Sequence, residues 1–230
     1  MSWINIRNWI CSPEIKEIEE LKNQDGESEL EKLYNNKYPK TDIFYAGRQL
    51  PNIKNNIKLD VRNFFMLNDA KVKTVASEIA IEETDDGNAL TCLKWVIKNI
   101  KYVLDNTKGQ LEFWQFPFET LEYKSGDCED GAILLANLMI MKGIPYWKIR
   151  LSAGFVNLNR KKIGHAYLTY YCESQGKWVI LDWCYWPNSL EIQDRKNYKD
   201  EENYLEVWFS WNLKYSYSKG LNTDAKEVLQ

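Results

Sequence analysis

Several patterns are absent from this chain of 230 residues, and each absence excludes a class of protein. The five cysteines form no CxxC pair, which argues against a zinc site or a disulfide framework. No window approaches eighteen consecutive apolar residues, so no membrane-spanning helix and no membrane partner are predicted. The net charge of −3 and the pI near 5.5 lack the basic footprint that nucleic-acid binding requires.

The first twenty residues, MSWINIRNWICSPEIKEIEE, also lack the continuous apolar run of a signal peptide and become acidic from Glu14. An odd, scattered set of cysteines is typical of a reducing compartment. We therefore expect a protein that stays in a cytoplasm.

What is present is a succession of helical patterns followed by strand patterns. Apolar residues recur at helical spacing over about 69–81, 87–100 and 128–141. The period then changes to two, which predicts strands at 147–156, 165–172, 177–183 and 204–212. Helices first and an antiparallel meander afterwards predict an α+β domain.

The N-terminal part has a different character from this domain. Ser12 followed by Pro13 predicts the start of a helical stretch that reaches about residue 38. Prolines, a glycine and an Asn/Lys-rich run predict an irregular arm over 39–67, with a short strand or extended segment at 60–66. We expect a helical extension or arm at 1–68 and a single α+β domain at 69–230, the domain that contains the chemical motifs described next.

Cys128 lies at the start of the third predicted helix, in SGDCEDGAILLANL. The free N–H groups of a helical first turn favour a thiolate, and a nearby imidazole would lower the pKa of the thiol further. The alternative is a packing cysteine, which usually lies within an apolar stripe, as Cys92 does in ALTCLKWV. Cys128 stands instead between Asp127 and Glu129, so we interpret it as a nucleophile.

His165 is the only histidine, and it opens the strand HAYLTYY. A hairpin that turns between residues 174 and 175 would place Asp182 opposite Tyr167, with His165 as its diagonal neighbour on the same face. A loop of odd length would put Asp182 on the other face. A structural histidine and a turn-capping aspartate are the alternatives, but a buried carboxylate in WVILD requires a partner, and the histidine would provide one.

Together these motifs resemble the transglutaminase-like superfamily of papain-type thiol enzymes. The resemblance rests on GDCEDGAILLANLM, GHAYLTYY and WVILD in this order, and covers roughly residues 85 to 212. It implies a papain-like fold, in which a cysteine heads a helix packed on a sheet that supplies the histidine and the aspartate. It also implies the roles of nucleophile, base and orienting acid for Cys128, His165 and Asp182.

The upstream segment FWQFPFETLEYKSGDCED resembles the region before the cysteine in bacterial transglutaminase-like cysteine proteinases and their phage-encoded relatives. This resemblance implies that Trp114 and Gln115 border the cleft. Gln115 is a candidate for the oxyanion hole beside the backbone N–H of Cys128, because its amide can donate to a developing oxyanion. An exposed loop glutamine is the alternative. Trp183 directly follows the aspartate and either lines the cleft or fills the sheet edge.

Acidic residues surround the cysteine. Some members of the proteinase group hold calcium there, and by resemblance Asp127, Glu129 and Asp130 could match those ligands. Calcium binds six to eight oxygens, more than these three residues supply, so we favour an alternative in which they brace the active-site helix. No other cofactor is expected.

The sequence therefore predicts a cysteine hydrolase, either a peptidase or an amidase, or else an acyl-transferase. The enzyme would act on protein or peptide carboxamides through a thioester. Its resemblance to phage-encoded proteins suggests a phage origin and virion proteins as substrates. The alternative is a non-enzymatic virion component or peptide-binding module that retains the fold.

Overall fold

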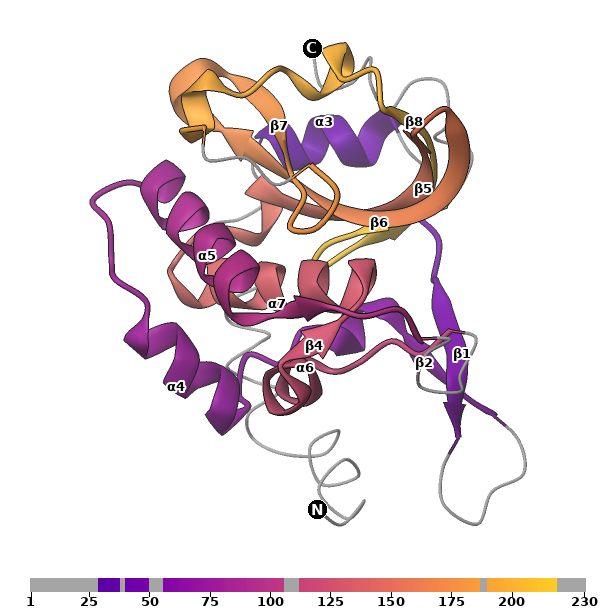
Figure 1. Ribbon diagram of the computed structural model, residues 1–230. Coiled ribbons are helices and arrows are strands. Elements are labelled where there is room, and N and C mark those ends of the chain that lie inside the picture. The colour runs from indigo at the N-terminus through magenta and orange to yellow at the C-terminus, as the bar shows by residue number, and fades with distance from the viewer. Residues whose placement is uncertain (1–28, 38–39, 50–55, 106–111, 187–189, 219–230) are drawn as a thin grey trace.

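A computed structural model of the chain describes residues 29–37, 40–49, 56–105, 112–186 and 190–218 (Figure 1). A curved antiparallel sheet forms the upper layer of the view, and four helices pack beneath it. The α+β class and the transglutaminase-like order of elements are thus as predicted. Within these ranges, no helix has the length and apolar character needed to cross a bilayer.

The three predicted helices are all present. They are α4 (Ala70–Glu78), α5 (Asp85–Asn99) and α7 (Cys128–Met141). Asp69 and Thr84 cap the first two by accepting backbone N–H groups. Helix α7 is buried along nearly its whole length, because it lies between the sheet and the other helices. An unpredicted helix, α6 (Pro117–Tyr123), begins at a proline whose missing N–H costs nothing in the first turn.

The main sheet has five strands in the order β7-β6-β5-β8-β9, and every neighbouring pair is antiparallel. The four predicted strands are confirmed, and the sheet has a short fifth strand that was not predicted. Their bounds are β5 (Ile149–Leu158), β6 (Lys161–Cys172), β7 (Lys177–Leu181), β8 (Tyr204–Trp211) and β9 (Ser216–Tyr217). Leu168 pairs with Leu181, which is the register predicted from the hairpin.

Short elements connect these layers. A two-residue parallel pair joins β3 (Lys101–Tyr102) to β4 (Ser125–Gly126) and so fixes the chain directly before α7. Single-turn 3-10 helices connect the remaining segments: η3 (Tyr146–Lys148), η4 (Glu173–Gln175), η5 (Ile192–Asp194) and η6 (Tyr198–Asp200). Arg150 of β5 is buried, with its guanidinium over the Tyr217 ring.

The N-terminal part differs from the prediction. Helix α3 (Glu29–Lys37) falls within the predicted helical stretch, and Leu30 packs on the face of the sheet opposite α7. The expected irregular arm instead forms a hairpin of β1 (Phe44–Gln49) and β2 (Asn56–Asp60). The expected strand at 60–66 is wrong, because Asp60 accepts the N–H of Arg62 and starts the 3-10 helix η1 (Val61–Phe64). Residues 12–28 lie outside the described part.

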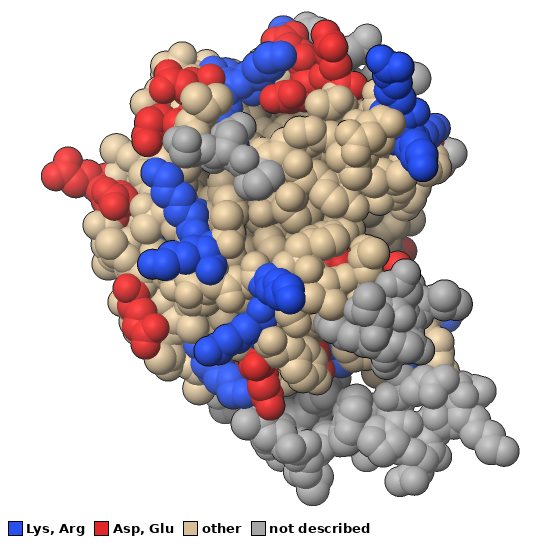
Figure 2. Space-filling view, in the orientation of Figure 1, with Lys and Arg blue, Asp and Glu red and all other residues tan. Residues whose placement is uncertain are grey.

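The hairpin and η1 share the core of the helical layer. Tyr45, Val61 and Phe64 belong to the same buried cluster as the apolar residues of α7. Figure 2 shows basic and acidic side chains interspersed on the visible face, without a large patch of one sign. The proposed division of the chain at residue 68 stays a prediction.

Candidate active site

Cys128 is the first residue of α7 and lines a cavity of about 540 Å³ between the helical layer and the sheet. Asp127 precedes it as the N-cap, and β4 holds the chain before that. His165, on β6, lines the same cavity. The structure thus places the predicted nucleophile and base on opposite layers that face one space.

His165 and Asp182 form the pair that the hairpin register predicts. The His165 Nε2 lies 2.6 Å from Asp182 Oδ2, and both side chains are almost completely buried. The backbone N–H groups of Cys184 and Tyr185 donate to Asp182 Oδ1, and the Tyr204 hydroxyl donates to Oδ2 at 2.8 Å. The aspartate is therefore held from every side and orients the imidazole.

The ionisation of Asp182 determines the form of the imidazole. Burial opposes the charged carboxylate, but the charge and hydrogen bond of His165 and the hydrogen bonds from Cys184 and Tyr204 lower its pKa below the usual value. An ionised Asp182 accepts a hydrogen bond from Nε2. In the neutral imidazole the hydrogen is then on Nε2, and Nδ1 is the acceptor. Nδ1 is buried and has no hydrogen-bond partner among the described residues.

The surroundings of Cys128 differ from the expectation of a lowered pKa. Burial and the nearby Glu129 and Asp127 carboxylates raise the pKa of the thiol well above its ordinary value, and only the backbone N–H of Ala166 lowers it. Cys128 Sγ lies 3.2 Å from Glu129 Oε2 and donates to it. Desolvation and the neighbouring acidic groups thus act against a thiolate at Cys128, in opposition to the helix N-terminus.

Aromatic side chains hold the imidazole from the side. The ring of Tyr185 stacks on His165 with centroids 4.3 Å apart, and its hydroxyl lies 3.1 Å from that of Tyr102. Both tyrosines line the cavity. No local sequence pattern points to Tyr102, which β3 brings to the cavity from a distant part of the chain.

Trp183 is not among the residues that line the cavity, so the first of its two expected positions, in the cleft, is not observed. It is buried, and its Nε1 donates to the backbone oxygen of Cys128 at 3.0 Å. Its indole lies against Gly131, where an added Cβ would come within 2.2 Å of the ring. Trp183 therefore fixes the first turn of α7 against the segment that follows Asp182.

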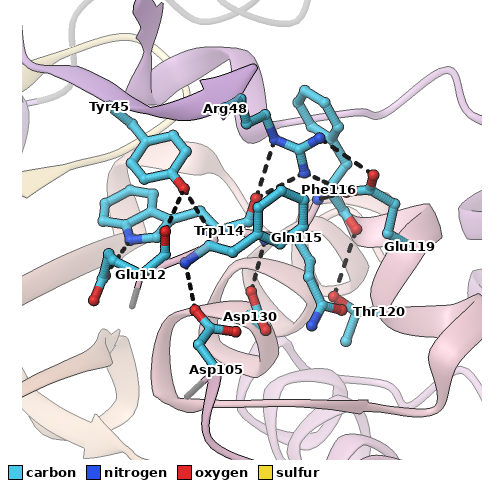
Figure 3. Close-up of polar contacts among 11 residues, drawn as sticks. Tyr45, Arg48, Asp105, Glu112, Trp114, Gln115, Phe116, Glu119, Thr120 and Asp130 are labelled. Carbon is cyan, nitrogen blue, oxygen red and sulfur yellow. Dashed lines mark hydrogen bonds and ion pairs between the residues drawn. The ribbon is translucent and has the colours of Figure 1, made fainter. Parts of the chain in front are cut away.

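Trp114 and Gln115, the two candidates upstream of the cysteine, lie in different surroundings. Trp114 lines the cavity, stacks on Tyr45 and donates from Nε1 to Glu112 (Figure 3). Gln115 is completely buried and is not among the residues that line the cavity. This differs from both expectations for Gln115, the oxyanion hole and the exposed loop.

The acidic residues divide in a similar way. Asp130 braces the helix start, since its two carboxylate oxygens accept the backbone N–H groups of Gln115 at 2.7 Å and Asp127 at 3.1 Å. Carboxylate oxygens of Asp105, Asp127 and Asp130 approach within 4.8 Å of one another, and Glu129 groups with Asp127 and Cys128. This set provides hard oxygens but fewer separate ligands than calcium prefers, because Asp130 is already engaged. Calcium binding stays a prediction.

Comparison with known proteins now complements this geometry. Residues 73–183 match the family model of the transglutaminase-like superfamily. This segment belongs to that superfamily. The matched segment contains Cys128, His165 and Asp182, together with most of α4, helices α5 to α7 and strands β5 to β7. The match supports a papain-like thiol enzyme as the broad class, and the roles of Cys128, His165 and Asp182 stay predictions.

Two individual proteins are similar to the chain. The UPF0252 protein PH1321 of Pyrococcus horikoshii is 33% identical over 88 residues, a match that covers 38% of this chain and only 24% of that protein. Legionella pneumophila LapG matches in structure with a TM-score of 0.47 and 17% identity over 68% of this chain and 90% of LapG. Its calcium-bound structure gives a TM-score of 0.45, with 19% identity over 66% of this chain and 88% of that chain.

Proposed function

We propose that this transglutaminase-like chain is a thiol acyl-transfer enzyme that attacks protein or peptide carboxamides with Cys128. The single observation that supports this most is the His165–Asp182 pair. The pair leaves a buried imidazole nitrogen without a partner on the wall of the cavity that contains the thiol. A nucleophile, a base and an orienting acid are the minimum set for this chemistry.

The proposed reaction begins from the neutral thiol. His165 Nδ1 takes the proton of Cys128 Sγ as the sulfur attacks the carbonyl carbon, and the carbonyl oxygen becomes an oxyanion. The backbone N–H of Cys128, in the first turn of α7, is our candidate donor to that oxygen. The imidazolium then gives the proton to the departing amine, and the C–N bond breaks to leave a thioester.

The thioester passes either to water, which regenerates the thiol and releases an acid, or to a primary amine, which forms a new amide. Hydrolysis defines a peptidase or amidase, and transfer defines a crosslinking enzyme. If the gene is phage-encoded, as the resemblance suggests, virion proteins are the proposed substrates.

The rate of iodoacetamide alkylation at Cys128 tests the proposal, with the modified site mapped by mass spectrometry. Because His165 acts as the base, His165→Ala should slow alkylation of Cys128 by about tenfold or more near neutral pH. Cys128→Ser gives the background from the other cysteines. Equal rates in the wild type and His165→Ala would contradict the proposal.

The fate of the thioester requires a second assay. A glutamine-containing peptide and monodansylcadaverine are incubated with the protein, and the products are separated by mass. A dansylated peptide that depends on Cys128 identifies transfer, and a deamidated or cleaved peptide identifies hydrolysis.

One observation favours the non-enzymatic alternative, a peptide-binding or virion structural module. Burial, Glu129 and Asp127 all raise the pKa of Cys128, as expected for a thiol under no selection for reactivity. The same alkylation experiment decides between the two, because such a module would show no dependence on His165.

A further inference from the structure

The cavity beside Cys128 has a wall that comes from outside the superfamily core. Ile43, Phe44, Tyr45 and Ala46, at the start of hairpin β1–β2, all line it. These residues precede the matched segment 73–183. The N-terminal hairpin is therefore part of the cleft, although the chemistry of the core does not require it.

Exposed apolar side chains line the cavity, both from this hairpin and from the segment that follows β3. Among the described residues, six large apolar side chains are exposed, and two of them, Phe44 at 54% and Leu104 at 47%, line this one cavity. Exposed apolar groups concentrated in a concave site are typical of a binding surface. Trp208 and Phe209 of β8 extend the apolar lining on the side of the sheet.

A network of buried contacts fixes the hairpin in place (Figure 3). Arg48 is buried, donates to the backbone oxygen of Trp114 at 2.7 Å and pairs with Glu119. Its guanidinium also lies over the rings of Phe113 and Phe116, with centroid distances of 4.5 and 4.1 Å. A guanidinium is costly to bury unless it is paired and hydrogen-bonded, so these contacts of Arg48 fix the position of β1.

Tyr45 adds a second anchor next to the exposed phenylalanine. Its hydroxyl accepts the backbone N–H of Trp114 at 3.0 Å and donates to the backbone oxygen of Glu112 at 3.1 Å. The ring folds back over Gly47, where a Cβ would lie 2.0 Å from the hydroxyl oxygen. The strand is irregular between Tyr45 and Arg48, which accommodates this arrangement.

We propose that hairpin β1–β2, together with Leu104 from the segment after β3, forms the substrate-selecting wall of the active site, and that Phe44 and Leu104 are the specificity-determining residues. The inference rests on the proposed function. The preferred substrate is a polypeptide with a large apolar side chain beside the carbonyl that Cys128 attacks. Arg48 is a positioning residue that holds Phe44 at the cavity.

Peptidyl chloromethyl ketones test this substrate class. Ac-Ala-Xaa-CH2Cl probes with Phe, Leu, Ala or Lys at Xaa are compared by their second-order rate of Cys128 alkylation. Each rate is divided by the iodoacetamide rate of the same variant, which removes changes in thiol reactivity. We expect Phe and Leu to exceed Ala by about tenfold, the size of discrimination that an apolar site provides.

Substitutions then assign the preference to residues. Phe44→Ala and Leu104→Ala should each reduce the Phe-over-Ala ratio severalfold. Ile81→Ala is the control, since Ile81 is an apolar residue of the same size as Leu104, is 81% exposed and lies outside the cavity. An unchanged ratio in both cavity variants, or a wild-type preference for Lys over Phe, would overturn the proposal.

The role of Arg48 needs a readout other than stability. Arg48→Met should lose the Phe-over-Ala preference at a temperature where circular dichroism shows a folded protein, and Arg48→Lys should restore only part of it. A destabilised Arg48→Met variant that keeps the wild-type preference would make Arg48 purely structural.

The two proposals fail in different ways. If Cys128 reacts with every probe independently of His165, the proposed function fails. If alkylation depends on His165 but Phe44→Ala and Leu104→Ala keep the wild-type preference, only the inference about the hairpin fails.

Discussion

Asp182 offers the sharpest test of how this site works, because two substitutions separate its structural role from its chemical one. Asp182→Asn keeps the size of the side chain and keeps an oxygen for the N–H groups of Cys184 and Tyr185. Its amide nitrogen would replace the oxygen that faces His165 and Tyr204. A donor at that position favours the tautomer in which Nε2 accepts, and this puts the hydrogen on Nδ1.

The two variants should therefore differ in stability. In Asp182→Ala, the buried His165 and three other donors lose their partner, which costs about 3–5 kcal/mol for a broken buried pair. A domain of this size loses roughly 2–4 °C of Tm per kcal/mol, so Asp182→Ala should melt about 6–20 °C lower. Asp182→Asn retains most contacts and should lose about 1–2 kcal/mol.

Asp182→Asn should have a large effect on the reaction although its effect on stability is small. Since Nδ1 would carry a hydrogen in Asp182→Asn, it could no longer accept the thiol proton, and substrate turnover should fall by roughly 10³–10⁴-fold. The assay pairs differential scanning fluorimetry with the alkylation rate of Cys128, which should fall by about tenfold or more. Wild-type alkylation by Asp182→Asn would refute the reasoning that Asp182 sets the tautomer.

Three further predictions follow from the same contacts. Gly131→Ala should lower stability by about 1–3 kcal/mol, measured by urea unfolding, because its Cβ would overlap the ring of Trp183. Burial and neighbouring carboxylates raise the pKa of Glu129 well above its usual value, so the native state loses stability as pH rises from about 4.3 toward the folded-state pKa. Glu129→Gln should therefore unfold at a higher urea concentration than the wild type at pH 8 but not at pH 4. It should also shift the pH midpoint of Cys128 alkylation downward, and an unchanged midpoint would contradict the charge effect. Asp130→Asn should lower Tm whether calcium or EGTA is present, because the carboxylate accepts two backbone N–H groups; a loss seen only with calcium would instead indicate a metal ligand.

The sequence alone was sufficient for the elements whose pattern is local. Helices α4, α5 and α7 and the strands of the main sheet follow from their apolar periods of 3.6 and two. The pairing of His165 with Asp182 also followed from parity. A two-residue period allows only one face for each residue once the hairpin loop is placed.

Only the tertiary structure decided which side chains reach the cavity. The resemblance implied that Gln115 borders the cleft, and Trp183 was expected either to line the cleft or to fill the sheet edge. Both residues are buried and do not line the cavity, while Phe44 and Tyr102 come to it from distant segments. Such contacts depend on how layers pack, and no local period encodes them. The pKa of Cys128 is a similar case, because a helix N-terminus is visible in sequence, whereas desolvation by the opposing sheet is not. SGDCEDGAILLANL therefore predicts the candidate nucleophile, and the packing around it raises the pKa of its thiol.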